Sequence, residues 1–336
     1  MQLTQEWDKT FPKSNNVDHE KVTFRNRYGI ILAADLYQPK DRNKAKLPAI
    51  VFSGPFGAVK EQASGLYAQT LAERGFVTLA FDPSFTGESG GNVRDTASPE
   101  IFTEDFSAAV DFIGLLPSVD RNRIGAMAIC GLSGMAITAA SSDSRIKAVA
   151  TASMYDMSRS MSRSYRDSYT PEQRHKVIDY ISQQRWVDAE NGTFSRGYHE
   201  VPFDANGDIM TSERLFPESL PQDANPIVVS FYDYYCKPRG FHSRSINSTT
   251  AWTATTPMPF FSFPLMGNID MVVPRPLMLV AGENAHSLYY SEDVYKAASH
   301  PKELVIVPSA DHVDLYDNTD KIPFDRLETF FKENLK

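Results

Sequence analysis

The most constraining feature of this sequence is an apolar run that ends abruptly in a cluster of small residues. Residues 123–129 predict a buried strand, which runs into Cys130-Gly-Leu-Ser-Gly134 and then into a helix of small residues through Ala140. A strand that turns sharply and restarts as a helix needs small neighbours, because the turn is strained and the helix packs closely. Such a turn lifts one reactive side chain above the end of the strand.

Strands and helices alternate on both sides of this turn. The pattern before it predicts an antiparallel pair at 22–27 and 30–37, strands at 49–53 and 76–81, and helices at 61–74 and 101–116. The pattern after it predicts strands at 146–152, 277–281 and 303–307, and helices at 291–298 and 324–335. We therefore predict an α/β fold with a mostly parallel central sheet flanked by helices, which binds ligands at the carboxyl ends of its strands.

The middle of the chain breaks this alternation. It is irregular and rich in proline and aromatic residues, with one helix predicted at 171–190. We therefore expect a sheet core formed by residues 1–153 and 274–336, interrupted by an inserted cap at 154–273. The aromatic residues of the insertion form either a second small core or the wall of a substrate pocket.

Composition narrows the class of protein. The 34 Lys+Arg against 42 Asp+Glu give a net charge of -8, which weighs against nucleic acid as a partner. Two cysteines exclude a disulfide framework and a four-cysteine zinc site. No secretory signal, apolar membrane span, phosphate loop or dinucleotide fingerprint occurs in the sequence. We predict a cytoplasmic protein that uses no cofactor and no metal, with no membrane partner, and homo-oligomers remain open.

Two residues of the small cluster are candidate nucleophiles. Cys130 falls at the end of the predicted strand, with Ala128 and Gly131 as small neighbours, and a helix N-terminus lowers the pKa of a thiol. Ser133 lies about one turn further along and is the alternative nucleophile. Against Cys130, Leu132 stands where a small residue is usual. In a third interpretation, Cys130 is only a buried small hydrophobic residue.

The base and the acid are expected after the later strands. His312 follows the last predicted strand directly and is the preferred general base, with His286 as a competitor at another strand end. Glu283 is the first carboxylate after the strand at 277–281, and we expect it to orient the imidazole. The alternative for Glu283 is a solvated loop carboxylate.

An oxyanion needs two backbone donors. The N–H of Gly131 directly follows Cys130, and the N–H of Phe56 follows the strand at 49–53. Pro55 has no N–H, so it cannot serve. The alternative is that Gly54-Pro55 is only a turn.

The chain resembles the α/β-hydrolases, and most closely the dienelactone-hydrolase-like group with a large inserted cap. Four motifs carry the resemblance: Ser53-Gly-Pro-Phe-Gly57, Asp82-Pro-Ser-Phe-Thr-Gly87-Glu-Ser-Gly90, Ile129-Cys130-Gly131 and Ala310-Asp311-His312. The group's order of nucleophile, acid and histidine is matched by Cys130, Glu283 and His312. The family pattern places an aspartate near position 285, where this chain has Ala285.

The resemblance implies a hydrolase that acts on a carboxylic ester, lactone or thioester through a Cys-His-acid triad and an acyl-enzyme. Its partner would be a small-molecule acyl substrate. One alternative is an acyltransferase of the polyketide-transferase type that uses the same residues. The other is an inactive α/β-hydrolase that serves as a binding protein, which Ala285 and Leu132 favour.

Overall fold

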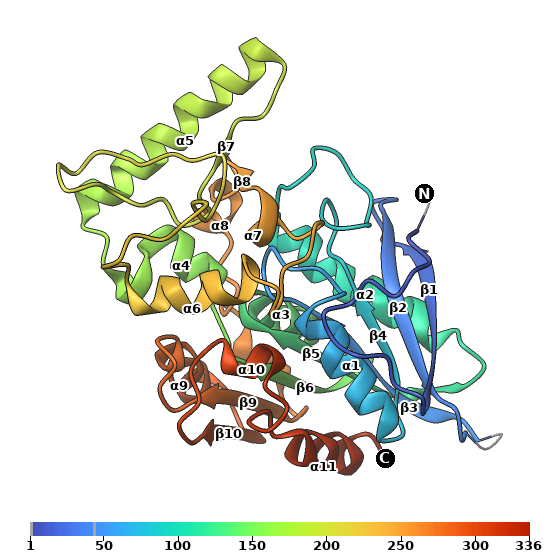
Figure 1. Ribbon diagram of the computed structural model, residues 1–336. Coiled ribbons are helices and arrows are strands. Elements are labelled where there is room, and N and C mark those ends of the chain that lie inside the picture. The colour runs from blue at the N-terminus through green and yellow to red at the C-terminus, as the bar shows by residue number, and fades with distance from the viewer. Residues whose placement is uncertain (1–2, 43–44) are drawn as a thin grey trace.

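The computed structural model describes residues 3–42 and 45–336 (Figure 1). Within them, a central sheet has the strand order β1-β2-β4-β3-β5-β6-β9-β10. Its strands are β1 (Val17–Arg25), β2 (Ile31–Pro39), β3 (Leu47–Ser53), β4 (Val77–Phe81), β5 (Val119–Ile129), β6 (Ile146–Ala152), β9 (Leu277–Gly282) and β10 (Lys302–Val307). β2 pairs antiparallel with both β1 and β4, whereas the other neighbouring strands are parallel. The predicted mostly parallel sheet is confirmed.

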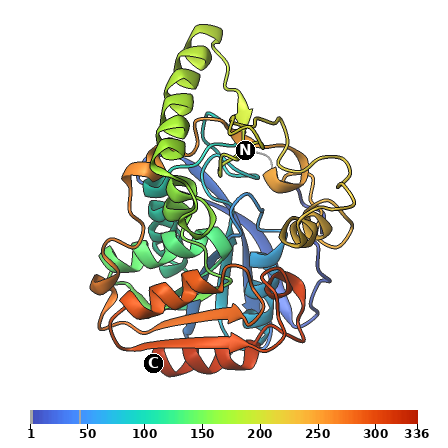
Figure 2. The ribbon, with the colours of Figure 1, turned by 90° about the vertical axis from the view of Figure 1, so that its left-hand side faces the viewer.

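Helices cover both faces of this sheet. α2 (Pro99–Gly114) packs against α3 (Ser133–Ser142), and α1 (Ala63–Glu73) packs against α11 (Phe324–Asn334). Figure 2 shows α11 below β9 and β10, with α9 (Leu288–Ala297) on the opposite side of these strands. Every residue of β4 and of β9 is buried, as expected for parallel strands covered on both faces.

The sequence pattern located most of these elements to within a few residues. β1 begins at Val17, five residues before the predicted start. β5 begins at Val119 instead of residue 123, and the pattern missed its start because residues 120–123 are polar and partly or fully exposed. The apolar pattern therefore marked only the buried part of β5. α9 begins at Leu288, three residues before the predicted start.

A long segment connects the neighbouring strands β6 and β9. It contains α4 (Met157–Arg163), α5 (Pro171–Asn191), α6 (Pro226–Tyr235), α7 (Ile246–Thr249), α8 (Met258–Ser262), the 3-10 turns η2 (Tyr165–Asp167) and η3 (Ile269–Val272), and the two-stranded sheet of β7 (Arg196–Gly197) and β8 (Trp252–Thr253). The predicted helix within it is α5, which begins with a capping box at Thr170 and projects away from the sheet (Figure 1). The division into core and cap stays a prediction.

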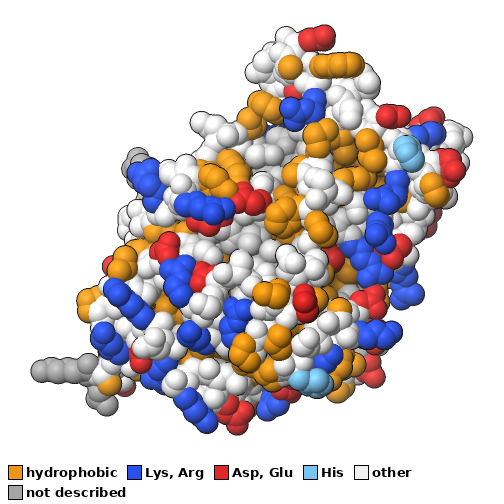
Figure 3. All heavy atoms as spheres, turned by 180° about the vertical axis from the view of Figure 1, so that it is seen from behind, with side chains coloured by type: hydrophobic (Ala, Val, Ile, Leu, Met, Phe, Trp, Pro, Cys, Tyr) orange, Lys and Arg blue, Asp and Glu red, His pale blue; other side chains and the backbone are white. Residues whose placement is uncertain are grey.

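The outer surface mixes charges of both signs. Figure 3 shows one face on which Lys and Arg side chains lie among Asp and Glu, with hydrophobic side chains interspersed. In the described part of the chain, no helix is both long and apolar enough to cross a bilayer.

Candidate active site

Cys130 occupies the turn between β5 and α3, at the start of the 3-10 turn η1 (Cys130–Leu132). Its φ is +55°, a left-handed conformation that costs a residue with a side chain about 1–3 kcal/mol. The Tyr155 N–H donates to the Cys130 carbonyl at 3.2 Å and ties the turn to the loop after β6. The strained turn thus holds the thiol at the carboxyl end of a central strand.

Two glycines let the neighbouring backbone come close to this turn. A Cβ on Gly131 would lie 2.6 Å from Phe56 Cβ and 2.6 Å from Met157 Sδ. A Cβ on Gly54 would lie 2.2 Å from the Ile129 carbonyl oxygen. The loop at 54–57, which follows β3, can therefore lie against the turn only because both positions lack a side chain.

The other side of this loop is held by the segment between β6 and β9. Asn247 Nδ2 donates to the Phe56 carbonyl at 2.8 Å, and Ser245 Oγ donates to the Gly57 carbonyl at 2.9 Å. The Phe56 ring also stacks on Trp252, with ring centroids 4.2 Å apart. These contacts fix the backbone of Phe56 relative to Cys130.

The thiol of Cys130 is buried, and three polar groups neighbour it. Burial raises the pKa of the Cys130 thiol to about 11, whereas the Tyr316 hydroxyl and the N–H groups of Gly131 and Phe56 oppose this rise by contacting the sulfur. The structure thus brings together the three groups predicted for the nucleophile and the oxyanion hole. Cys130 and Cys236 are both free thiols.

His312 lies beyond β10, and both of its ring nitrogens have side-chain partners. Nδ1 is 2.5 Å from Ser287 Oγ, and Nε2 is 3.0 Å from Tyr316 Oη. Because Tyr316 also contacts the sulfur of Cys130, its hydroxyl lies between the thiol and the imidazole. Burial, with a smaller effect of His286, lowers the pKa of His312 well below its usual value, so the ring is neutral.

The structure does not bring the predicted acid, Glu283, to His312. Glu283 is exposed, and its Oε2 accepts a hydrogen bond from the Ser309 N–H at 2.9 Å. The prediction is corrected here, because the turn after β9 directs Glu283 outward and presents Ser287 to the ring. With Ala285 in the position that the family pattern gives to aspartate, the partner of Nδ1 is a neutral hydroxyl.

Ser133, the alternative nucleophile, faces away from the site. It is fully buried in the first turn of α3, and its Oγ donates to the Ala128 carbonyl at 3.3 Å. A hydroxyl that points back along β5 has no access to a substrate. Of the two candidate nucleophiles, Cys130 lines the cavity and Ser133 does not.

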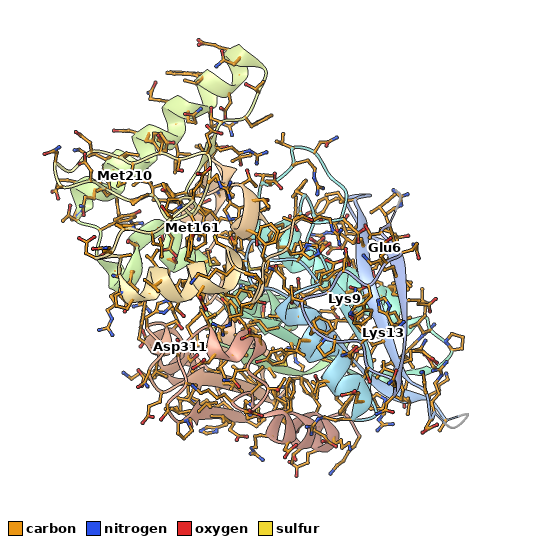
Figure 4. The ribbon with its side chains drawn as sticks, viewed as in Figure 1. Glu6, Lys9, Lys13, Met161, Met210 and Asp311 are labelled. Carbon is orange, nitrogen blue, oxygen red and sulfur yellow. The ribbon has the colours of Figure 1, made fainter. Side chains whose placement is uncertain are left out.

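His286, the competing base, lies beside His312 with ring centroids 4.8 Å apart. Its Nε2 is 3.4 Å from Tyr155 Oη, and burial lowers its pKa to about 4. Asp311, labelled in Figure 4, accepts hydrogen bonds from Ser230 Oγ at 3.3 Å and from a backbone N–H of its own loop. The side chain of Cys130 neighbours Tyr316, which contacts His312, whereas His286 connects through Tyr155 to the backbone of Cys130.

A cavity of about 350 Å³ opens onto Cys130. This volume suits a small molecule, and most of the aromatic wall comes from the segment between β6 and β9. The aromatic side chains that line it are Phe56, Tyr155, Tyr165, Tyr198, Phe216, Phe231, Tyr235 and Tyr316. Throughout residues 3–42 and 45–336, no three His, Cys, Asp or Glu side chains gather as a metal site would require.

Sequence reasoning missed Tyr316, Ser287 and a carboxyl group in the cavity wall, that of Glu200. Tyr316 had a weak signal, because it follows His312 by four residues and would share its face in a helical turn. Ser287 and Glu200 had none, since their positions depend on how a loop and the long middle segment fold.

Comparison with known proteins identifies the relatives of this chain. The model of the X-Pro dipeptidyl-peptidase (S15) family matches residues 28–183. The chain is similar to the uncharacterized protein PA2218 of Pseudomonas aeruginosa, with 58% identity over 335 residues that cover 100% of this chain and 86% of that protein. It is 33% identical to the uncharacterized protein YcjY of Escherichia coli over 323 residues, which cover 94% of this chain and 99% of YcjY.

A shorter match and two solved structures extend this comparison. The thiohydrolase aneE of Aspergillus aculeatus is 33% identical over 131 residues, or 39% of this chain and 40% of aneE. The crystal structure of PA2218 superposes with a TM-score of 0.92 over 99% of both chains. The α/β hydrolase GrgF from Penicillium sp. sh18 superposes with a TM-score of 0.75 at 18% identity, over 95% of this chain and 99% of GrgF, and supports the fold alone.

Proposed function

Since the chain belongs to the α/β-hydrolase superfamily, in one family with PA2218 and YcjY, we propose that it hydrolyses a carboxylic ester, lactone or thioester through an acyl-cysteine. One observation carries the proposal. Cys130 sits at a strained strand-to-helix turn, where two backbone N–H groups face its sulfur and an aromatic cavity lies in front of it. This is the arrangement that nucleophilic acyl chemistry needs.

The first step in this proposal activates the thiol through Tyr316. In the tautomer with a proton on Nδ1, the Cys130 S–H donates to Tyr316 Oη, and the Tyr316 O–H donates to His312 Nε2. As the sulfur attacks, its proton passes to the tyrosine oxygen while the tyrosine proton passes to Nε2. Ser287 Oγ accepts from Nδ1–H and holds the ring in this orientation.

The sulfur then forms a bond to the carbonyl carbon, and the carbonyl π electrons move onto the oxygen. The N–H groups of Gly131 and Phe56 stabilise this oxyanion. When the oxygen lone pair re-forms the carbonyl, the bond to the alcohol or thiol breaks, and the leaving group takes the proton from His312. Water, deprotonated by the same histidine, next attacks the acyl-cysteine and releases the carboxylic acid together with the free thiol.

Because Ser287, the partner of His312 Nδ1, is neutral, the site favours substrates with a reactive carbonyl group. A carboxylate beside Nδ1 would stabilise the imidazolium by charge, whereas the hydroxyl of Ser287 cannot. The low pKa of His312 makes it a weak base for a buried thiol of high pKa. We therefore favour a thioester or a strained lactone over an ordinary alkyl ester, and the name of the relative aneE, a thiohydrolase, supports this choice.

Acyl transfer is the second candidate, because the cavity wall is largely apolar and a bound alcohol or amine can displace water from it. Transfer would use the same acyl-cysteine and differ only in what attacks it. Adding a primary alcohol to the assay and separating the free acid from the new ester distinguishes the two outcomes.

The proposal is tested with matched aryl ester, lactone and thioester substrates against three variants. We expect Cys130→Ala to abolish turnover and His312→Ala to reduce it by about 100-fold or more, the usual size of general acid–base catalysis. Ser133→Ala should retain turnover, since Ser133 does not face the cavity. Intact-mass analysis of the quenched enzyme should show one acyl group, lost in Cys130→Ala.

An alkylation assay separates an inactive binding protein from an enzyme. Iodoacetamide should modify Cys130 faster than Cys236 in the native protein, and His312→Ala should remove that advantage. Equal rates at the two thiols, or full turnover in Cys130→Ala, would contradict the proposed mechanism.

A further inference from the structure

The wall of the active-site cavity contains a carboxyl group that the proposed hydrolysis does not use. Glu200 lines the cavity together with Cys130, shortly after β7 in the segment between β6 and β9. Its Oε1 accepts a hydrogen bond from Ser160 Oγ. Its Oε2 accepts no hydrogen bond from the described residues and is not covered completely, which leaves it open to a ligand.

No positive side chain among the described residues compensates this carboxyl. No ion pair of Glu200 is found there, and burial raises its pKa with only Ser160 acting in the opposite direction. Arg159, which precedes Ser160 in the chain, is already paired with Asp167 at 2.7 Å and Asp293 at 2.8 Å. A half-buried carboxyl without a positive partner is unfavourable as an anion, so the position suits a cationic partner from outside the chain.

The surroundings of Glu200 suit a cation. Its charge acts on the hydroxyls of Tyr155, Tyr169 and Tyr290, and Tyr165 and Tyr198 line the same cavity. Aromatic faces attract an ammonium group by about 0.5–2 kcal/mol, and more strongly where water is excluded. A carboxylate set among aromatic rings therefore attracts an ammonium group of a ligand both by a hydrogen bond and by its charge. A hydroxyl group of a ligand would gain only the hydrogen bond.

We propose that Glu200 binds a positively charged amino group of the substrate, so that the enzyme acts on ammonium-bearing acyl compounds. This inference rests on the proposed hydrolysis at Cys130 and names its substrate class. The ammonium group donates a hydrogen bond to Oε2, and the surrounding rings stabilise its charge. Glu200 is then a specificity residue, which selects the substrate without taking part in bond breaking.

The kinetic test uses substrates that differ in one group. Phenyl thioesters of 6-aminohexanoic, heptanoic and 6-hydroxyhexanoic acid place an ammonium, a methyl or a hydroxyl at the same position. We expect Glu200→Gln, which keeps the contact with Ser160, to lower kcat/KM about tenfold or more for the 6-aminohexanoic thioester.

The neutral substrates should change less than threefold in Glu200→Gln, and Glu190→Gln, at the exposed end of α5, should change neither class. An equal loss for charged and neutral substrates would overturn the inference, because Glu200 would then be structural. A loss confined to the hydroxyl substrate would overturn it too, since the site would recognise a neutral polar group.

A binding measurement keeps this result separate from the hydrolysis itself. Calorimetry with Cys130→Ala, which cannot form an acyl-enzyme, should show that 6-aminohexanamide binds at least about tenfold more tightly than heptanamide. Adding Glu200→Gln should remove the difference. If calorimetry shows the ammonium preference but no thioester is cleaved, the proposed hydrolysis fails and the ammonium site stands. If both amides bind with equal affinity, the ammonium site alone is overturned.

Discussion

At the residue scale, the proposed mechanism depends on the hydroxyl of Tyr316, which would transfer the proton from the thiol of Cys130 to His312. The hydroxyl is 3.0 Å from His312 Nε2 and also contacts the sulfur. Because burial raises the pKa of the Cys130 thiol to about 11, almost no thiolate forms at neutral pH without help. A hydroxyl between the two groups can relay the proton in a single concerted shift.

Tyr316→Phe removes this hydroxyl and keeps the ring. We expect the rate of alkylation of Cys130 by iodoacetamide at pH 7 to fall about tenfold or more, and kcat to fall by about 100-fold or more. Raising the pH should restore alkylation, because the thiol then ionises without the relay as the pH approaches its pKa of about 11. A pH–rate profile of both proteins between pH 6 and 10 measures this difference.

Tyr67→Phe is the matched control. Tyr67 is also fully buried, and its hydroxyl donates to the Leu315 carbonyl at 2.8 Å in the short helix α10 (Asp314–Asp317) that carries Tyr316. The substitution Tyr67→Phe removes a buried hydrogen bond of a similar kind but leaves the candidate active site intact. Unchanged alkylation in Tyr316→Phe, or an equal loss in Tyr67→Phe, would exclude the relay.

The sequence predicted those site residues that strand ends determine. Cys130 follows β5 directly and His312 lies five residues after β10, while Phe56 follows β3, the strand beside β5, so the sheet brings them to one edge. The partner of Nδ1 was predicted wrongly, because the direction of Glu283 depends on a turn that has no periodic pattern. Glu200 could not be found from periodicity, since the fold of the whole middle segment places it.

At the scale of elements, the loop at 54–57 connects the end of β3 to the candidate active site. It lies between the turn at Cys130 and the helix α7 (Ile246–Thr249), and it carries one of the two proposed oxyanion donors. Gly54 has φ +102°, and its missing side chain leaves room for the Ile129 carbonyl. The position of the Phe56 N–H thus depends on Gly54, two residues before it.

Gly54→Ala should inactivate the enzyme by moving this loop. The added Cβ would lie 2.2 Å from the Ile129 carbonyl oxygen, so the loop must shift and take the Phe56 N–H with it. We expect kcat to fall by about 100-fold or more, the usual loss for one oxyanion donor. Steady-state kinetics with a thioester substrate measures the loss.

Gly75→Ala separates this steric effect from backbone strain. Gly75 has the same φ of +102°, but nothing lies within 4 Å of an added Cβ. Its replacement should cost about 1 kcal/mol of stability and leave kcat unchanged. If both variants lost activity alike, strain in the glycine backbone and not the contact with β5 would be the cause.

Elements whose residues repeat with a clear period were predictable, and the others were not. The buried strands and α5 stood out because apolar runs and a proline-led cap mark them. The short helices α7 and α8 and the two-residue strands β7 and β8 carry no such pattern, because contacts with neighbouring segments hold them, such as those of α7 with the loop at 54–57 and of α8 with α4. The aromatic composition of that segment indicated a pocket wall without indicating its geometry.

At the scale of the whole molecule, a buried network of charges joins distant parts of the chain. Lys60 Nζ lies 2.8 Å from Glu61, 2.9 Å from Asp82 and 2.7 Å from Glu88. Arg244, from the segment between β6 and β9, reaches the same Glu61 at 2.9 Å. The loops after β3 and β4 are thereby tied to that segment.

The N-terminal region joins this network as well. Lys21 of β1 lies 2.9 Å from Glu61 and 2.6 Å from Glu88, and Arg244 lies 2.6 Å from Asp8. Nearby, Lys9 pairs with the buried Asp35 of β2 at 2.9 Å, and Figure 4 shows Lys9 beside α1. The network therefore connects Asp8 near the N-terminus, strand β1 and the segment between β6 and β9.

Lys60→Met tests how much this network stabilises the fold. The substitution keeps the apolar length of the side chain but leaves Asp82, Glu61 and Glu88 close together with less positive charge. Removing one partner of a buried ion pair costs about 3–5 kcal/mol, whereas Lys237→Met, at an exposed pair with Asp233, should cost no more than about 1 kcal/mol. Urea unfolding of the two variants and the unaltered protein measures both values.

The pH dependence of this loss identifies its cause. Without Lys60, the crowded carboxylates repel one another, so their pKa values rise in the folded state above those of the unfolded chain. A raised carboxyl pKa means that the folded state binds more protons, and its stability then increases as the pH falls. We therefore expect the difference between Lys60→Met and the unaltered protein to shrink from pH 7 to pH 5. A difference that stays constant over this range would assign the loss to packing and not to charge.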